Sequence, residues 1–183
     1  MKKIIALASL ATASLTAMAN PFQLSSPDLA SGGKIGQSFA YNGFGCTGKN
    51  LSPALSWKNA PAGTKSFAIT VHDPDAVTGG GGFWHWVVVN IPASTQSLAE
   101  NAGNSNSTTL PAGALQIPTD FGVAGWGGPC PPAGDKPHRY NFTVYALKVD
   151  KLELPPTATA GLTGFMINAN ALAKTSFTST YQR

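Results

Sequence analysis

Charged residues are scarce in this 183-residue chain, in which Asp, Glu, Lys and Arg together make up 11%. The chain is nevertheless 43% hydrophobic, which excludes an intrinsically disordered protein and allows one sizeable buried core. Twelve basic residues stand against eight acidic ones, and removing Lys2 and Lys3 of the N-terminal segment leaves ten. Because ten against eight is no basic excess, we expect no nucleic-acid partner.

Cysteine is also nearly absent, with only Cys46 and Cys130 in the chain. Neither lies in a Cys-x-x-Cys motif, which argues against a thiol oxidoreductase and against a cysteine-type zinc site. In an exported chain, an even pair of cysteines predicts a disulfide, and two buried free thiols are the alternative.

The N-terminus resembles an export signal. Two lysines precede an apolar run that is too short and too rich in Ala and Ser for a good membrane anchor, and Ala-Met-Ala supplies a cleavage site. We predict a signal peptide over residues 1–19, cleaved between Ala19 and Asn20, and a single domain over residues 20–183 in the periplasm or medium. No cysteine follows the cut, so no lipid anchor is expected; an N-terminal transmembrane helix is the alternative.

Short strand-like segments alternate with turn clusters, which predicts a β-rich domain with one or two peripheral helices. The predicted strands cover residues 65–72, 83–92, 139–149 and a last stretch near 177–181. Residues 93–134 are rich in Ser, Asn, Gly and Pro and are expected to be mostly loop. In the third strand, alternate apolar residues should share one face: Tyr140, Phe142, Val144 and Ala146.

Near the C-terminus the apolar spacing becomes helical, and we expect one amphipathic helix within residues 160–175. Its predicted apolar face consists of Leu162, Phe165, Met166, Ala169, Leu172 and Ala173.

Polar clusters lie at the ends of three predicted strands. Asp73-Pro74-Asp75 follows the first strand, His85 begins the second, and His138-Arg139-Tyr140 begins the third. Strand ends that meet at one rim of a sheet form pockets, so these side chains are predicted to meet.

Each of these residues also has a simpler interpretation. Asp73-Pro74-Asp75 is a turn signal by itself. His85 alternates with Val87, Val89 and Ile91, so it could be an ordinary core histidine. His72 is interpreted as structural or surface-exposed, and the glycine run 79–82 as a short connection between strands.

The segment from Phe121 to His138 alternates glycine and proline with little side-chain bulk. Glycine lets backbone N–H groups approach a ligand closely, and successive N–H groups can form an anion-binding nest. A rigid loop pinned by Cys130 explains the composition equally well.

Four ordered motifs together resemble one known family. They are GFGCTGKNLSPALSW, DPDA, HWVVVNIP and GWGGPCPPAGDKPHRYNFTVYAL, and the resemblance spans roughly residues 22–183. The chain is similar to the phosphatidylethanolamine-binding proteins (PEBPs), and more closely to the bacterial branch described as Raf-kinase-inhibitor-like.

This resemblance implies a small, mainly β, sandwich-like fold with a shallow anion pocket. The implied ligand is a phosphate-type or phosphoethanolamine-like small molecule, with no cofactor and no bound metal. The implied ligand-binding residues are Asp73, Asp75, His85, His138 and Tyr140, with the Gly128-Pro129 loop beside them and Trp84 at the flank. The family usually continues DPDAP, whereas this chain has Val77, so the turn after Asp75 is expected to differ in shape.

Two negatively charged aspartates in an anion pocket would be expected to repel the anionic ligand. Our hypothesis is that they orient the histidines, because a carboxylate that accepts a ring N–H fixes the tautomer and the ring orientation. The other ring nitrogens, the Tyr140 hydroxyl and loop N–H groups would then bind the anion. A cationic head group would lie near an aspartate or over a tryptophan face.

Three other functions fit parts of the pattern. A hydrolase could use the same Asp and His residues, but the chain has neither a GxSxG nor a HExxH motif, and we expect no enzymatic activity. A metal could bind Asp73, Asp75, His85 and His138. The chain could also be a protein-interaction module that inhibits or modulates a protein partner, but its sequence contains no motif specific to such a partner.

Overall fold

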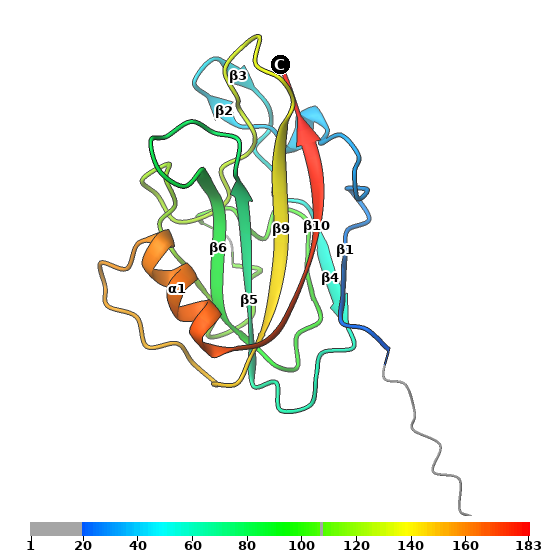
Figure 1. The fold of residues 1–183 in the computed structure, drawn as a ribbon, viewed down its shortest axis with the longest axis vertical. Coiled ribbons are helices and arrows are strands. Elements are labelled where there is room, and N and C mark those ends of the chain that lie inside the picture. The colour runs from blue at the N-terminus through cyan, green and yellow to red at the C-terminus, as the bar shows by residue number, and fades with distance from the viewer. Residues whose placement is uncertain (1–19, 107) are drawn as a thin grey trace, which may run out of the picture.

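Two antiparallel sheets and one helix form three layers in the computed structural model, which describes residues 20–106 and 108–183 (Figure 1). The predicted signal peptide lies outside these residues. The larger sheet has the strand order β10-β9-β5-β6-β8 and the second has the order β1-β4-β7. The predicted mainly β, sandwich-like architecture with a C-terminal helix is therefore confirmed.

The larger sheet is built from long strands with continuous apolar or alternating sequences. Its members are β5 (Ser66–Asp73), β6 (Phe83–Pro92), β8 (Leu115–Gln116), β9 (His138–Leu147) and β10 (Ala171–Tyr181). The predicted strands at 65–72, 83–92 and 139–149 agree with β5, β6 and β9 to within two residues. β5 is paired on both sides and is almost wholly buried, including its polar residues Ser66, Thr70 and Asp73.

The second sheet and the remaining elements are short. They are β1 (Gln23–Ser25), β4 (Leu55–Lys58), β7 (Ser97–Leu98), the hairpin strands β2 (Asn42–Gly43) and β3 (Cys46–Thr47), and the 3-10 turn η1 (Gln37–Phe39). Residues 93–134 contain only β7 and β8 among their described positions, so the predicted long loop region is confirmed.

The core between the two sheets takes one face of each. Tyr140, Phe142, Val144 and Ala146 all lie in this core, as their alternation in β9 predicts. Trp57 of β4 meets Phe67 of β5 across it, with ring centroids 5.4 Å apart.

The opposite face of the larger sheet packs against α1 (Ala160–Asn170), which lies at the left of Figure 1. Thr159 caps its N-terminus, because the Thr159 side chain accepts a hydrogen bond from the Leu162 N–H. Ala160 and Ile167 are buried against Val87 and Val89 of β6.

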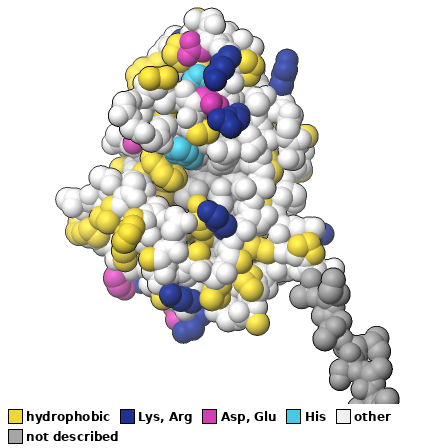
Figure 2. Space-filling model, viewed as in Figure 1, with side chains coloured by type: hydrophobic (Ala, Val, Ile, Leu, Met, Phe, Trp, Pro, Cys, Tyr) yellow, Lys and Arg dark blue, Asp and Glu magenta, His cyan; other side chains and the backbone are white. Residues whose placement is uncertain are grey.

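The predicted apolar face of this helix is wrong. The helix ends at Asn170, so Leu172 belongs to β10, which begins at Ala171 rather than near residue 177. Inside the helix, Leu162 and Phe165 are exposed (42% and 69%). Figure 2 shows hydrophobic side chains on the surface over α1 and the loop before it.

The helix instead turns small residues to the sheet. Its buried residues are Ala160, Thr163, Gly164 and Ile167, at the spacing i, i+3, i+4 and i+7. Gly164 lies against the Trp84 ring, where a Cβ would be in ordinary van der Waals contact at 3.4 Å. A rule that counts only large apolar residues overlooks such a face.

No helix among the described residues has both the length and the apolar character needed to cross a membrane.

Candidate functional site

A cavity of about 280 Å³ opens at the end of the larger sheet where β5 ends and β6 and β9 begin. Its polar lining comes from Asp73, Thr78, His85, Asp135, His138 and Tyr140. The other lining residues are mostly apolar and include Phe44, Phe83, Phe121, Pro131 and Pro132. Four of the predicted site residues, Asp73, His85, His138 and Tyr140, therefore meet in one cavity although the chain separates them by up to 67 positions.

His85 reaches this cavity because of a β-bulge. Val71 of β5 pairs with Trp86, whereas the next residue, His72, pairs with Trp84, so His85 is the extra residue of β6. Trp84 consequently packs with the helix-side core.

Because of this bulge, the predicted alternation of β6, in which His85 shares a face with Val87, Val89 and Ile91, is wrong. Val87 and Val89 belong to the core beneath α1, whereas the His85 ring lies 5.0 Å from the ring of Tyr140 in the core between the sheets. Ile91 also lies in the core between the sheets, because a second register shift precedes it. Strict period-two counting cannot anticipate either shift.

The protonation state of His85 follows from its surroundings. The ring is buried among the rings of Phe83, Phe121 and Tyr140, with centroids 5.3, 5.4 and 5.0 Å away. This burial lowers the pKa of His85 to about 4, so the ring is neutral at neutral pH. Its Nδ1 lies 2.6 Å from the Gly127 carbonyl oxygen, which can only accept, so Nδ1 donates and Nε2 carries a free lone pair.

His138 is oriented by Asp73. The Nδ1 of His138 donates to Oδ2 of Asp73 across 2.8 Å, and both side chains are almost completely buried. The other oxygen of Asp73 accepts the backbone N–H groups of Asp75 and Ala76 at 2.8 and 3.1 Å. Nε2 of His138 faces Asp135 at the cavity rim, 3.4 Å from Oδ2.

Asp75 is not among the residues that line the cavity. It pairs with Arg139, whose Nε and second guanidinium nitrogen donate to its two oxygens at 2.9 and 2.8 Å. These hydrogen bonds hold the pKa of the Asp75 carboxyl well below its usual range. The pair joins the turn after β5 to the start of β9.

The Tyr140 hydroxyl is fully buried close to the Asp73 carboxylate and makes no hydrogen bond of full geometry to any of the described residues. Burial raises the pKa of Tyr140, and the neighbouring Asp73 charge adds to the effect, so the phenol remains protonated across the physiological range. An unpaired buried hydroxyl costs stability, which makes this one a candidate ligand-binding group.

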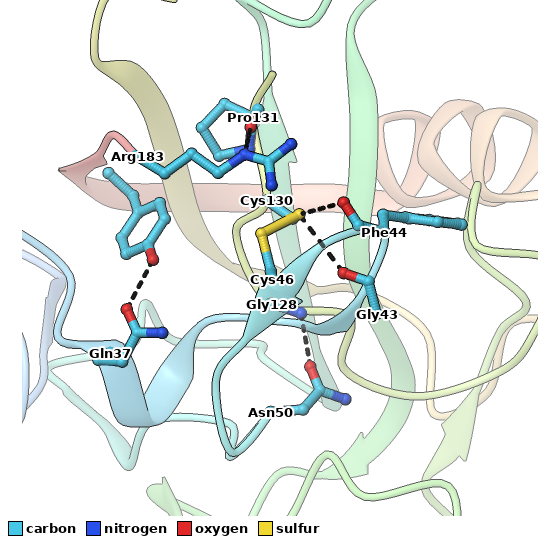
Figure 3. Close-up of a disulfide and its surroundings, with 10 residues drawn as sticks. Gln37, Gly43, Phe44, Cys46, Asn50, Gly128, Cys130, Pro131 and Arg183 are labelled. Carbon is cyan, nitrogen blue, oxygen red and sulfur yellow. Dashed lines mark hydrogen bonds between the residues drawn. A yellow bond between two sulfur atoms is a disulfide. The ribbon is translucent and has the colours of Figure 1, made fainter. Parts of the chain in front are cut away.

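The predicted disulfide between Cys46 and Cys130 is present and forms part of the cavity wall (Figure 3). It joins β3 to the loop that carries Pro131, and the backbone carbonyl of Pro131 accepts a hydrogen bond from the Arg183 Nε at 2.6 Å. The wall is therefore fixed by one covalent bond and by the C-terminal residue.

Besides Asp75, three further predicted site residues are not among the lining residues of the cavity. Gly128 is buried against the backbone of Phe39, where a Cβ would clash, and its N–H donates to Asn50 Oδ1 at 2.8 Å. Pro129 accepts from the Tyr41 N–H with its carbonyl. Trp84 contacts the ring of His72, with centroids 4.5 Å apart.

His72 has the structural role that we predict for it. Its Nε2 donates to the Gly81 carbonyl at 2.6 Å, which holds the loop between β5 and β6. Within this loop, Gly82 has φ +81° and no room for a Cβ against the Asp73 carbonyl. The glycine run is thus a compact connection.

Sequence reasoning missed the aromatic and acidic parts of the wall. Phe44 lies two residues before Cys46, so the predicted disulfide could have placed it beside the Cys130 loop. Phe121 and Asp135 lie in irregular segments, where no periodic signal marks a pocket residue.

No cluster of three or more His, Cys, Asp or Glu side chains with a metal-binding arrangement occurs in the part of the chain that the structure describes. Asp75, one of the four residues considered as metal ligands, is bound on both oxygens by Arg139.

Comparison with known sequences defines the class of protein. The chain matches the phosphatidylethanolamine-binding protein family over residues 25–182 and therefore belongs to that family.

The relatives place it within a bacterial branch. YbcL of Escherichia coli K12 is 48% identical over 182 residues, which covers 100% of this chain and 99% of YbcL. YbhB of the same organism is 45% identical over 159 residues, covering 87% of this chain and 99% of YbhB. The crystal structure of E. coli YbcL, described as a new member of the mammalian PEBP family, matches with a TM-score of 0.86 at 49% identity over 88% of this chain and 98% of YbcL.

Proposed function

We propose that the cavity binds a small molecule through a phosphate or similar anionic group, such as a phospholipid head group, and does not turn it over. The observation that carries this proposal is the buried, unpaired Tyr140 hydroxyl beside two oriented histidines. Such convergent polar groups in a mostly apolar cavity are typical of a small-ligand site.

The aspartates do not oppose an anion in this arrangement. The carboxylate oxygens of Asp73 accept hydrogen bonds from the His138 ring and from two backbone N–H groups. The charge of Asp75 is compensated by Arg139. Asp73 is therefore a positioning residue for His138, which supports the hypothesis drawn from the sequence for this aspartate, whereas Asp75 binds Arg139 and orients no histidine.

The two histidines have different roles toward a phosphate group. Because Nε2 of His85 carries a lone pair, it accepts a hydrogen bond from the remaining proton of a singly protonated phosphate monoester; the phosphodiester of a lipid has no such proton and is bound by the donor groups alone. Tyr140 donates its hydroxyl hydrogen to a phosphate oxygen. Nε2 of His138 lines the cavity beside Asp135, 3.4 Å from its Oδ2, and is the ring nitrogen of His138 that Asp73 leaves for a ligand.

The rim also suits a cationic end of the ligand. The Asp135 side chain is about half exposed (48%) and lines the cavity, so an ammonium group can pair with it. One cavity could thus bind both ends of a phosphoethanolamine-like zwitterion, the ammonium group at Asp135 and the phosphate at Tyr140 and the histidines.

Two features favour binding without catalysis. Among the described residues that line the cavity, none is serine, and Cys130 is held in the disulfide. The Asp73–His138 pair resembles the base of a hydrolase, but neither a serine hydroxyl nor a free thiol lines the cavity beside it.

We further propose that the protein works outside the cytoplasm. The charged and apolar character of residues 1–19 supports export, and a disulfide is the usual state of a cysteine pair in an oxidising compartment.

Calorimetric titration with phosphoethanolamine tests the ligand class. Tyr140→Phe should weaken binding by about tenfold to one hundredfold, the value of one hydrogen bond to a charged group, and His138→Ala by at least as much. Tyr145→Phe is the matched control, since Tyr145 lies in the same strand and belongs to the helix-side core. Equal affinities for the wild type and His138→Ala would refute the proposal.

A further inference from the structure

A second cavity, of about 300 Å³, lies beside the first. The two cavities share the side chain of Phe121, which lines both. The ring of Phe121 packs on Tyr41 of the second cavity (centroids 4.5 Å) and on Phe83 of the first (4.9 Å). Phe121 is thus the partition between two adjoining spaces.

The position of this partition is built into the backbone. Gly127 follows the loop of Phe121 and has no side chain, and a Cβ there would collide with the Phe121 ring. Gly127 also accepts the His85 hydrogen bond with its carbonyl oxygen. Gly127 therefore contacts both the Phe121 ring that separates the two cavities and the His85 ring of the first cavity.

The lining of the second cavity differs in chemistry from that of the first. Amide, hydroxyl and ammonium groups dominate it, including those of Lys49, Asn101, Asn104 and Ser105. Some polar groups are already occupied, since Asn50 donates to the Trp126 carbonyl and accepts from Gly128. Others are available.

Lys49 and Asn104 carry the available polar groups. Both are exposed, and Lys49 takes part in no ion pair among the described residues. Asn104 uses Oδ1 to accept the Asn106 N–H, which leaves its amide N–H groups for a ligand.

We propose that the two cavities are subsites of one binding site, and that the second holds the hydroxylated, sugar-like part of a ligand whose phosphate occupies the first. Hydroxyl groups of a ligand can accept hydrogen bonds from the lysine ammonium and the amide N–H groups, and can donate to the amide oxygens. The rings of Tyr41 and Phe121, which pack on each other, give the second cavity an apolar side against which the C–H side of a sugar ring can lie. This inference rests on the proposed function of the first cavity and adds the class of its ligand, a sugar phosphate, free or carried on a lipid.

Two phosphomonoesters of equal charge separate the subsites. Ethyl phosphate fills the first cavity alone, whereas glucose 1-phosphate adds a hydroxylated ring. The wild-type protein should bind glucose 1-phosphate about tenfold more tightly, the value of one or two added hydrogen bonds. Calorimetry on the full mature chain measures both affinities.

Variants of the second cavity identify the source of this preference. In Lys49→Ala and in Asn104→Ala the tenfold preference should fall to about threefold, and in the double variant it should be lost, while the affinity for ethyl phosphate remains at the wild-type value. Lys58→Ala, another exposed lysine that lies outside both cavities, is the matched control and should retain the full preference. Circular dichroism verifies that the variants are folded.

The outcomes distinguish this inference from the proposed function. If ethyl phosphate binds but glucose 1-phosphate binds no better, or if the full preference survives in both variants, the second subsite is refuted and the first remains. If ethyl phosphate itself fails to bind, the proposed function fails. Vesicles containing phosphatidylinositol, added to the glucose 1-phosphate complex, compete if the site takes lipid-borne sugar phosphates and do not compete if it takes only soluble ones.

Discussion

His85 shows how a single buried ring acquires a defined chemical role. Aromatic neighbours exclude water and lower its pKa, and the Gly127 carbonyl selects the tautomer. A neutral ring with a free Nε2 lone pair results, which distinguishes His85 from His138, whose ring nitrogens both face carboxylates.

The lowered pKa of His85 predicts a specific dependence of stability on pH. The folded-state pKa of about 4 lies below the unfolded value of 6.5, so the unfolded chain binds the proton first as the pH falls. The contribution of His85 is therefore complete above about pH 6.5 and is lost between pH 6.5 and 4. We expect a loss of roughly 3 kcal/mol in the free energy of unfolding from this residue.

Urea denaturation at pH 7 and pH 4.5 measures this loss. The variant His85→Asn keeps a donor for the Gly127 carbonyl but has no titrating ring, so its free energy of unfolding should fall less over this range than that of the wild type. An identical fall in both proteins would contradict the assigned protonation state.

At the residue scale, the sequence was informative where a side chain stands at a strand end. Asp73 and His138 were placed correctly because each adjoins a segment of clear strand character. The face of His85 was placed wrongly, since the bulge that turns it depends on pairing with β5 rather than on the residues of β6 alone.

At the scale of elements, α1 shows the limit of apolar periodicity. Its large apolar residues Leu162 and Phe165 point to solvent, and its buried face is made of small residues with Ile167. The close approach of Gly164 to Trp84 is a tertiary property that no local pattern reports.

The burial of Ile167 and the exposure of Phe165 predict different effects of alanine substitutions on stability. Ile167→Ala should lower the free energy of unfolding by about 2–5 kcal/mol, because Ile167 is fully buried beneath the helix. Phe165→Ala should change it by no more than about 0.5 kcal/mol, because that ring is mostly exposed.

Chemical denaturation of the two helix variants at neutral pH provides the comparison. Both replacements put alanine in the same helix, so differences in helix propensity are small beside the expected effect. If Phe165→Ala proved the more destabilising change, the helix would be docked on the face that its sequence first indicates.

At the scale of the whole molecule, the three layers explain why the cavity has its composition. The sheet supplies Asp73, His85 and His138 from three strands that meet at one end. The irregular segments supply the rest of the wall, and the disulfide joins two of them.

The fold class, the long strands and the cysteine pairing could be predicted because they depend on composition, alternation and count. The outer wall could not, since Phe44, Phe121 and Asp135 are brought to the cavity only by the folding of loops far apart in the chain. The second cavity follows from the same long-range packing.

The most direct test of the account uses the three histidines of the chain together. Nitrogen-15 NMR of the imidazole rings is recorded during a titration with ethyl phosphate. The signals of His85 and His138 should shift along one saturable curve with a common dissociation constant, while those of His72, which lies outside the cavity, remain in place. Unchanged signals for His85 and His138 at saturating ligand, or equal shifts for all three rings, would contradict a phosphate site in this cavity.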